Sequence, residues 1–201
     1  MIKLSMAGAA ALVLTLSAAQ ADSSARALPQ PAVDETTAGH DLETAVFSGG
    51  CFWGVQGVFE HIKGVTRAVS GYAGGHVANP GYEQVSSGST GHAESVEIVF
   101  NPAKLSYEQL LGYFFRMHDP TTRDQQENDI GSQYRSAIFY TSDEQRQIAA
   151  RVKMQVDKSG KWKRPIVTEI TKAMVFYPAE EYHQDYLQKN PGGYNCHYLR
   201  N

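Results

Sequence analysis

The chain has 201 residues and a formal net charge of −3, and 42% of its residues are hydrophobic, 10% aromatic and 19% charged. This is the composition of an ordinary globular protein, and the length suits one domain with one core. Because the sequence lacks a basic footprint, we expect neither nucleic acid nor an acidic membrane as a partner.

The N-terminal segment has the layout of a secretory signal peptide. Lys3 precedes an uncharged apolar run over residues 4–19, and Ala19-Gln20-Ala21 fits the A-x-A pattern of a cleavage site. A retained membrane-spanning helix is the alternative, but the run is short and weakly flanked for one. We therefore predict that residues 1–21 are a signal peptide cut after Ala21, and that the mature protein is exported to the periplasm.

A change of composition follows the predicted cleavage site. Residues 22–40 are rich in Ser, Ala, Thr, Pro and acidic residues, which is typical of a flexible leader that lies outside the fold. The remaining part, residues 41–201, is predicted to be a single catalytic domain.

The first part of this domain predicts a strand, a helix and a second strand. Residues 44–48 are β-branched and aromatic, and Gly49-Gly50 ends this first strand. Apolar residues then recur at helical spacing from Cys51 to Ile62, and Lys63-Gly64 is a plausible end of that helix. Residues 65–73 predict a second strand, which is followed by a loop to about His92.

The second part continues the alternation of strands and helices. Apolar residues alternate with polar ones over 95–100, which predicts a half-buried strand. Ser106 and Ser142 begin capping sequences of two helices, and a short helix follows Pro178. Further strands are expected at 134–141 and 166–170. This order predicts an α+β fold, a two-layer mixed sheet with helices and a ferredoxin-like core.

Cys51 lies at the junction of a strand, two glycines and a helix. Unpaired N–H groups and the helix dipole stabilise negative charge at such a point, and the thiolate is the reactive form of cysteine. The glycines leave room for a substrate to approach. Phe52 and Trp53 could wall an apolar pocket beside the thiol, although packing in the core is the commoner role of such aromatics.

Glu94 is a candidate general acid. It shares strand parity with Val96, Ile98 and Phe100, so its carboxyl group is expected on the buried face. Desolvation favours the neutral form of a carboxyl group, which is the form that donates a proton. Carboxylates are seldom fully buried, and the alternative is that Glu94 precedes the strand and turns outward.

The cysteines and histidines alone leave two functions open. In an oxidising compartment Cys51 and Cys196 could form a structural disulfide in a binding module. Alternatively, Cys51 could serve a Cys–His hydrolase with His183 or His92 as its base. A metal site is not expected, because His92-Ala93-Glu94 lacks the P-C-x-x-C of zinc deaminases and the seven histidines form no H-E-x-x-H.

Five motifs in a fixed order carry a resemblance to a known family. They are Gly50-Cys51-Phe52-Trp53-Gly54, Tyr82-Glu83-Gln84-Val85, Gly88–Glu94, Gly131–Ser136 and Tyr182-His183-Gln184. Together these motifs span roughly residues 44–200. The sequence resembles the A-type peptide methionine sulfoxide reductases over essentially the whole predicted domain.

The resemblance implies a reaction and the groups that perform it. Cys51 would attack the sulfoxide sulfur and become a sulfenic acid, while Glu94 protonates the oxygen. Tyr82 and Tyr134 would hydrogen-bond to that oxygen, and Asp129 would organise the polar side of the pocket.

The resemblance also implies how the substrate is chosen. Phe52 and Trp53 would hold the S-methyl group, and the pocket would select the S epimer of methionine sulfoxide, in oxidised proteins or as the free amino acid. His183 is expected to support the structure rather than act as a base.

The resemblance implies that the second cysteine returns Cys51 to its reduced form. Cys196 lies in a glycine-rich stretch near the C-terminus, and its attack on the sulfenic acid would give a Cys51–Cys196 disulfide. Since no third cysteine is present, an external thioredoxin-like dithiol would have to reduce this bond directly. No cofactor is expected, and we expect a monomer.

Overall fold

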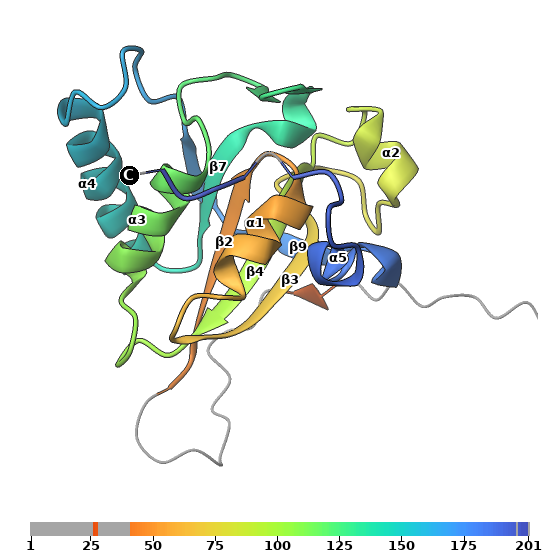
Figure 1. Cartoon of the computed structure of the whole chain (residues 1–201), viewed down its shortest axis with the longest axis horizontal. Helices are drawn as coiled ribbons and strands as arrows, with labels where there is room; N and C mark the ends of the chain where they lie inside the picture. Colours follow the sequence, from red (N-terminus) through yellow and green to blue (C-terminus); the bar gives the residue numbers. More distant parts are fainter. Residues whose placement is uncertain (1–25, 28–40, 196, 201) are drawn as a thin grey trace, which may run out of the picture.

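The computed structural model describes residues 26–27, 41–195 and 197–200, and Figure 1 shows its elements in the order of the chain. The predicted signal peptide, most of the predicted leader and Cys196 lie outside the described residues. Within the predicted leader, the backbone of β1 (Arg26–Ala27) pairs with that of β9.

A seven-stranded mixed sheet organises the fold, in the order β1-β9-β3-β4-β2-β7-β8. Its strands beyond β1 are β2 (Glu43–Gly49), β3 (Val65–Ala73), β4 (Ala93–Phe100), β7 (Ser136–Tyr140), β8 (Glu169–Lys172) and β9 (Val175–Pro178). A separate two-stranded ribbon consists of β5 (Gln125–Gln126) and β6 (Asp129–Ile130). The helices are α1 (Phe52–Phe59), α2 (Tyr82–Ser86), α3 (Tyr107–Met117), α4 (Asp143–Lys158) and α5 (Tyr186–Lys189), with 3₁₀ turns at Ser132–Tyr134 and Glu181–His183. None of the helices in the described part is long and apolar enough to cross a membrane.

The four central strands have ferredoxin-like topology. They lie in the spatial order β7-β2-β4-β3, their chain order is β2, β3, β4, β7, and each neighbouring pair is antiparallel. Helix α1 connects β2 to β3, and α3 lies between β4 and β7 in the chain. The predicted α+β class and ferredoxin-like core are therefore confirmed.

The core occupies both faces of the central strands. One face, against α1 and α3, buries large aromatics that include Phe47, Phe59 and Phe114. The other face is a smaller cluster around Phe139 and Phe176. Apolar burial of this kind is the main favourable contribution to folding.

The prediction that β4 is half-buried is wrong. Ser95 and Glu97 are each only 1% exposed, because the second cluster, which includes Ala93 of β4, covers the face that was expected to meet solvent. The charge of Glu97 is compensated by Arg67, whose guanidinium lies 3.1 Å from its carboxylate. Alternation of polar and apolar residues therefore does not distinguish a solvated face from a buried one that carries an ion pair.

Several element boundaries differ from those predicted. Helix α1 ends at Phe59, and the chain turns through Gly64, whose φ of +107° suits glycine. The strand expected at 134–141 begins at Ser136, because a 3₁₀ turn precedes it. The strand expected at 166–170 lies at 169–172, while helix α2 and strand β9 had not been expected. The N-caps Ser106 and Ser142 are confirmed, since each accepts the N–H three residues later.

Candidate active site

Cys51 is the N-cap residue of α1 and lies where β2 ends. Its side chain is buried, at 7% exposure. Gly50 adopts φ +104°, and a Cβ there would lie 2.7 Å from the Gln126 side chain. The glycine before the cysteine thus serves close packing of the chain against Gln126, while the open approach for a substrate stays a prediction from the sequence.

Glu94 lies at the buried end of β4, as its strand parity predicted. It is 2% exposed, and its Oε2 accepts a 3.0 Å hydrogen bond from the backbone N–H of Phe52 in the first turn of α1. Burial raises the pKa of Glu94 to about 8, against the lowering effect of that N–H and with a further rise from Asp129. At neutral pH the carboxyl group therefore carries a proton.

Two tyrosine hydroxyls belong to the same electrostatic group. Tyr82 begins α2, and Tyr134 ends the 3₁₀ turn before β7. Burial raises the pKa of each above its ordinary value, and negative charge at Cys51 and Glu94 raises both further. Both phenols therefore remain protonated donors near the thiol and the carboxyl group.

Asp129, in β6, lies at the polar edge of this group. Its charge raises the pKa of both Glu94 and Tyr134. Its Oδ2 also accepts a 3.1 Å hydrogen bond from the hydroxyl of Tyr194, near the C-terminus. The structure thus brings the predicted residues of the described chain together from five elements.

The two aromatics after Cys51 differ in exposure. Phe52 is 1% exposed and packs against Tyr72 and His183. Trp53 is half-buried and stacks on Tyr186 at a centroid distance of 3.7 Å and an interplanar angle of 11°. Its indole N–H donates to Nδ1 of His183 at 3.0 Å, which fixes the orientation of the ring.

The two histidines that could have served a hydrolase are engaged elsewhere. Nδ1 of His183 accepts the bond from Trp53, and burial lowers the pKa of this histidine. His92 accepts from the N–H of Gly75 through Nδ1 and donates to the carbonyl of Val77 through Nε2. These bonds leave neither ring placed as a base for Cys51, and the structural role predicted for His183 fits its contacts.

Glu180 is a residue of the site that the sequence reasoning missed. Its carboxylate accepts the N–H of Tyr82 at 2.9 Å and the hydroxyl of Tyr72 at 2.8 Å, and lies 4.0 Å from Nε2 of His183. Burial alone would raise the pKa of Glu180, but these hydrogen bonds outweigh it and hold the pKa below its usual value. Its place two residues before the Tyr182-His183-Gln184 motif was the available signal.

No metal centre accompanies these groups in the part of the chain that the structure describes, where no three His, Cys, Asp or Glu side chains are arranged to hold an ion. Cys196 lies outside the described residues. Its neighbours Asn195 and His197 lie against α1, where a Cβ on Gly54 would clash with both.

Comparison with known proteins identifies the family. The sequence model of the family described as peptide methionine sulfoxide reductase matches residues 43–201. The peptide methionine sulfoxide reductase MsrA of Methanosarcina mazei is 52% identical over 151 residues, which cover 75% of this chain and 72% of that protein.

Solved structures agree with the sequence match. The reduced form of Mxr1 from Saccharomyces cerevisiae is 37% identical with a TM-score of 0.75, covering 80% of this chain and 93% of that one. Mxr1 in complex with Trx2 is 27% identical with a TM-score of 0.56, covering 83% and 97%. This chain belongs to the A-type peptide methionine sulfoxide reductases, the oxidoreductases that reduce methionine sulfoxide with a thioredoxin-type reductant.

Proposed function

We propose that this chain reduces the S epimer of methionine sulfoxide with Cys51 as nucleophile and Glu94 as general acid. The Cys51 thiolate attacks the sulfoxide sulfur, Glu94 gives its proton to the oxygen, and the oxygen passes to the cysteine. The products are methionine and a Cys51 sulfenic acid, so the sulfoxide is reduced as the thiol is oxidised. The observation that carries the proposal is a buried, protonated Glu94 bonded to the first turn of the helix that Cys51 caps.

The surrounding groups give this reaction its orientation. Tyr82 and Tyr134 donate hydrogen bonds to the sulfoxide oxygen, where negative charge develops, and Asp129 organises the polar side. Phe52 and the fixed ring of Trp53 hold the S-methyl group. Because oxygen donors and methyl pocket lie on different sides of the sulfur, only one epimer presents its oxygen and its methyl group correctly.

Cys196 resolves the oxidised enzyme in this proposal. Its thiol displaces water from the sulfenic acid and forms a Cys51–Cys196 disulfide, which an external thioredoxin-like dithiol then reduces. The yeast protein solved in complex with Trx2 supports a reductant of this class. The N-terminal sequence supports export to the periplasm after cleavage behind Ala21, which makes an exported thioredoxin-like partner necessary.

One assay tests the proposal. Wild-type protein is incubated with methionine S-sulfoxide or R-sulfoxide, in the presence and absence of dithiothreitol, and methionine is quantified. We expect turnover of the S epimer with dithiol, about one methionine per enzyme without it, and no product from Cys51→Ser. A hydrolase or a binding module would release no methionine from either epimer under any condition, because neither supplies the two electrons that the reduction of a sulfoxide needs. N-terminal sequencing of the secreted protein checks the cleavage site.

A further inference from the structure

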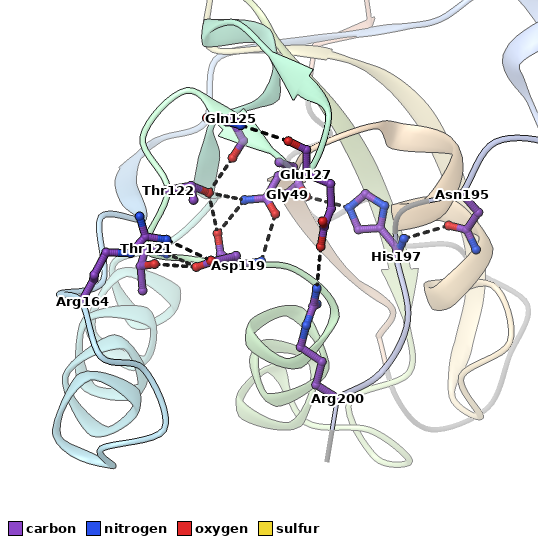
Figure 2. Close-up of polar contacts among 11 residues, drawn as sticks. Gly49, Asp119, Thr121, Thr122, Gln125, Glu127, Arg164, Asn195, His197 and Arg200 are labelled. Carbon is purple, nitrogen blue, oxygen red and sulfur yellow. Dashed lines mark hydrogen bonds and ion pairs between the residues drawn. The ribbon is translucent and has the colours of Figure 1, made fainter.

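The C-terminal tail, residues 197–200, is bonded to the end of β2, to α3 and to the turn between β5 and β6. Figure 2 shows His197 beside Gly49 and Arg200 beside Glu127, and Figure 1 shows the end of the chain beside α3. Nε2 of His197 donates to the carbonyl of Gly49 at 2.7 Å. Gly49 is the last residue of β2, two positions before Cys51.

The side chain of His197 is packed inside the protein rather than on its surface. Its side chain is only 4% exposed. At Gly54, in the first turn of α1, a Cβ would lie 2.3 Å from Nδ1 of His197 and 2.7 Å from Oδ1 of Asn195. The same Asn195 oxygen accepts the backbone N–H of His197 at 2.9 Å. Glycine at position 54 is thus what allows both residues to approach the helix.

A second anchor lies at the end of the tail. Arg200 donates its backbone N–H to the carbonyl of Arg116 at 2.9 Å, and Nε of Arg116 returns a 2.8 Å bond to the carbonyl of Arg200. The Arg200 guanidinium lies 3.4 Å from the Glu127 carboxylate. The tail is therefore attached to α3 and to the turn between β5 and β6, beyond its attachment to β2.

We infer that His197 is a positioning residue for the resolving step, because Asn195 and His197, the two chain neighbours of Cys196, lie against Gly54 and Gly49 on either side of Cys51. The inference rests on the proposed function. Neighbouring α-carbons of a chain are 3.8 Å apart, so fixing residues 195 and 197 restricts the reach of the thiol between them. Such restriction raises the effective concentration of a thiol toward its target. In the step itself the S–S bond forms, the S–O bond of the sulfenic acid breaks, and water leaves with the thiol proton.

The inference predicts a defect confined to disulfide formation. Wild type, His197→Ala and His197→Gln are each mixed with one equivalent of methionine S-sulfoxide without reductant, and samples are quenched over time with acid or with dimedone. Methionine is quantified, and the disulfide and the Cys51 dimedone adduct are followed by mass spectrometry. We expect His197→Ala to form methionine at the wild-type rate but the disulfide about tenfold more slowly, the loss expected for one buried hydrogen bond. The Cys51–dimedone adduct should accumulate in this variant.

Two further substitutions separate positioning from a general loss of structure. His197→Gln retains a donor that reaches the Gly49 carbonyl, and it should restore most of the rate of disulfide formation. Gly54→Ala places a methyl group where the His197 ring packs against α1, so it should displace His197 and also slow the formation of the disulfide. Gly112→Ala in α3 is its matched control, since a Cβ there meets nothing within 4 Å, and it should behave as wild type.

The outcomes distinguish the inference from the proposed function. Absence of methionine from the wild type would refute the proposed function itself. Wild-type methionine together with an unchanged rate of disulfide formation in His197→Ala would overturn the inference alone. If circular dichroism shows that His197→Ala is unfolded, Gly54→Ala decides, and a wild-type rate of disulfide formation in that variant overturns the inference.

Discussion

The backbone N–H of Phe52 donates a 3.0 Å hydrogen bond to Oε2 of Glu94, and it thereby joins the helix that begins after Cys51 to the buried carboxyl group on β4. A helix N-terminus favours an anion, yet burial in β4 favours the neutral acid. The effect of burial is the larger of the two, and the pKa of Glu94 is raised to about 8. The start of α1 can then stabilise negative charge on the Cys51 sulfur, while the carboxyl group of Glu94 retains the proton that it donates to the sulfoxide oxygen.

The first prediction concerns this proton. Replacing Glu94 by Gln keeps an acceptor for the Phe52 N–H but removes the acid, so we expect the rate of methionine formation to fall by roughly 10²–10⁴-fold, the usual contribution of a general acid. In the wild type the rate of this step should fall as the pH rises through about 8, because the free enzyme loses the acidic proton. Single-turnover formation of methionine between pH 6 and 9.5 measures both effects.

A matched control lies on the same strand. Glu97 is equally buried in β4 but faces Arg67 on the opposite side. Glu97→Gln should keep both the rate of methionine formation and its decline above pH 8. Persistence of that decline in Glu94→Gln would show that another group sets it.

A second prediction concerns the two hydroxyls. Tyr82→Phe and Tyr134→Phe each remove one donor to the developing negative charge, and we expect each to lower kcat about tenfold, while the double variant should lose at least the product of the two. Tyr107→Phe is the control, because its buried hydroxyl has no hydrogen-bond partner among the described residues and lies on α3, outside the site. Steady-state kinetics with a dithiol reductant give kcat and KM separately. Wild-type kcat in the double variant would contradict a role for these hydroxyls.

Sequence reasoning succeeds here where the signal is local. The glycine pair and the helical stripe after Cys51 placed the thiol at a helix start, and strand parity placed Glu94 inside. It failed where burial depends on distant partners: Glu97 lies on a polar register yet is covered, and Glu180 acquires its role only when the chain after β9 returns to Tyr82. Helix α2 was missed because it spans only five residues in a Gly- and Ser-rich stretch. The docking of His197 is likewise invisible in the sequence, because it depends on the absence of a side chain at Gly54.

The third prediction concerns Glu180. Its carboxylate holds the N–H of Tyr82 and the hydroxyl of Tyr72, so Glu180→Ala should let the start of α2 move. We expect kcat to fall about tenfold with a smaller change in KM. The effects of Glu180→Ala and Tyr82→Phe should be less than additive, because Glu180 acts through Tyr82. Glu181→Ala is the control, since this neighbouring carboxylate is 89% exposed. Full additivity with Tyr82→Phe would mean that Glu180 acts by another route.

The last prediction concerns stability and pH. Burial lowers the pKa of His118 to about 3 and that of His197 to about 4, and it lowers the pKa of His92 and His183 in the same direction. As the pH falls below about 6.5, these histidines bind protons in the unfolded chain but stay neutral in the folded protein. The free energy of unfolding therefore decreases. Glu94 acts in the opposite sense, because its folded form keeps a proton up to about pH 8 that the unfolded chain loses near 4.5. The two effects together place maximal stability near pH 6.5.

Urea unfolding between pH 5 and 8.5, followed by tryptophan fluorescence, measures the free energy of unfolding as a function of pH and tests whether it has this maximum. Each fully coupled histidine contributes a slope of about 1.4 kcal/mol per pH unit below its unfolded pKa. His197→Gln keeps a donor for the Gly49 carbonyl but cannot bind a proton, so the slope between pH 6 and 5 should fall by about that amount. Glu94→Gln should flatten the alkaline side and steepen the acid side, because the opposing slope of Glu94 extends from about pH 4.5 to about pH 8. Unchanged acid slopes in His197→Gln would mean that the tail releases His197 to solvent before the protein unfolds, and that its docking is weaker than its burial implies.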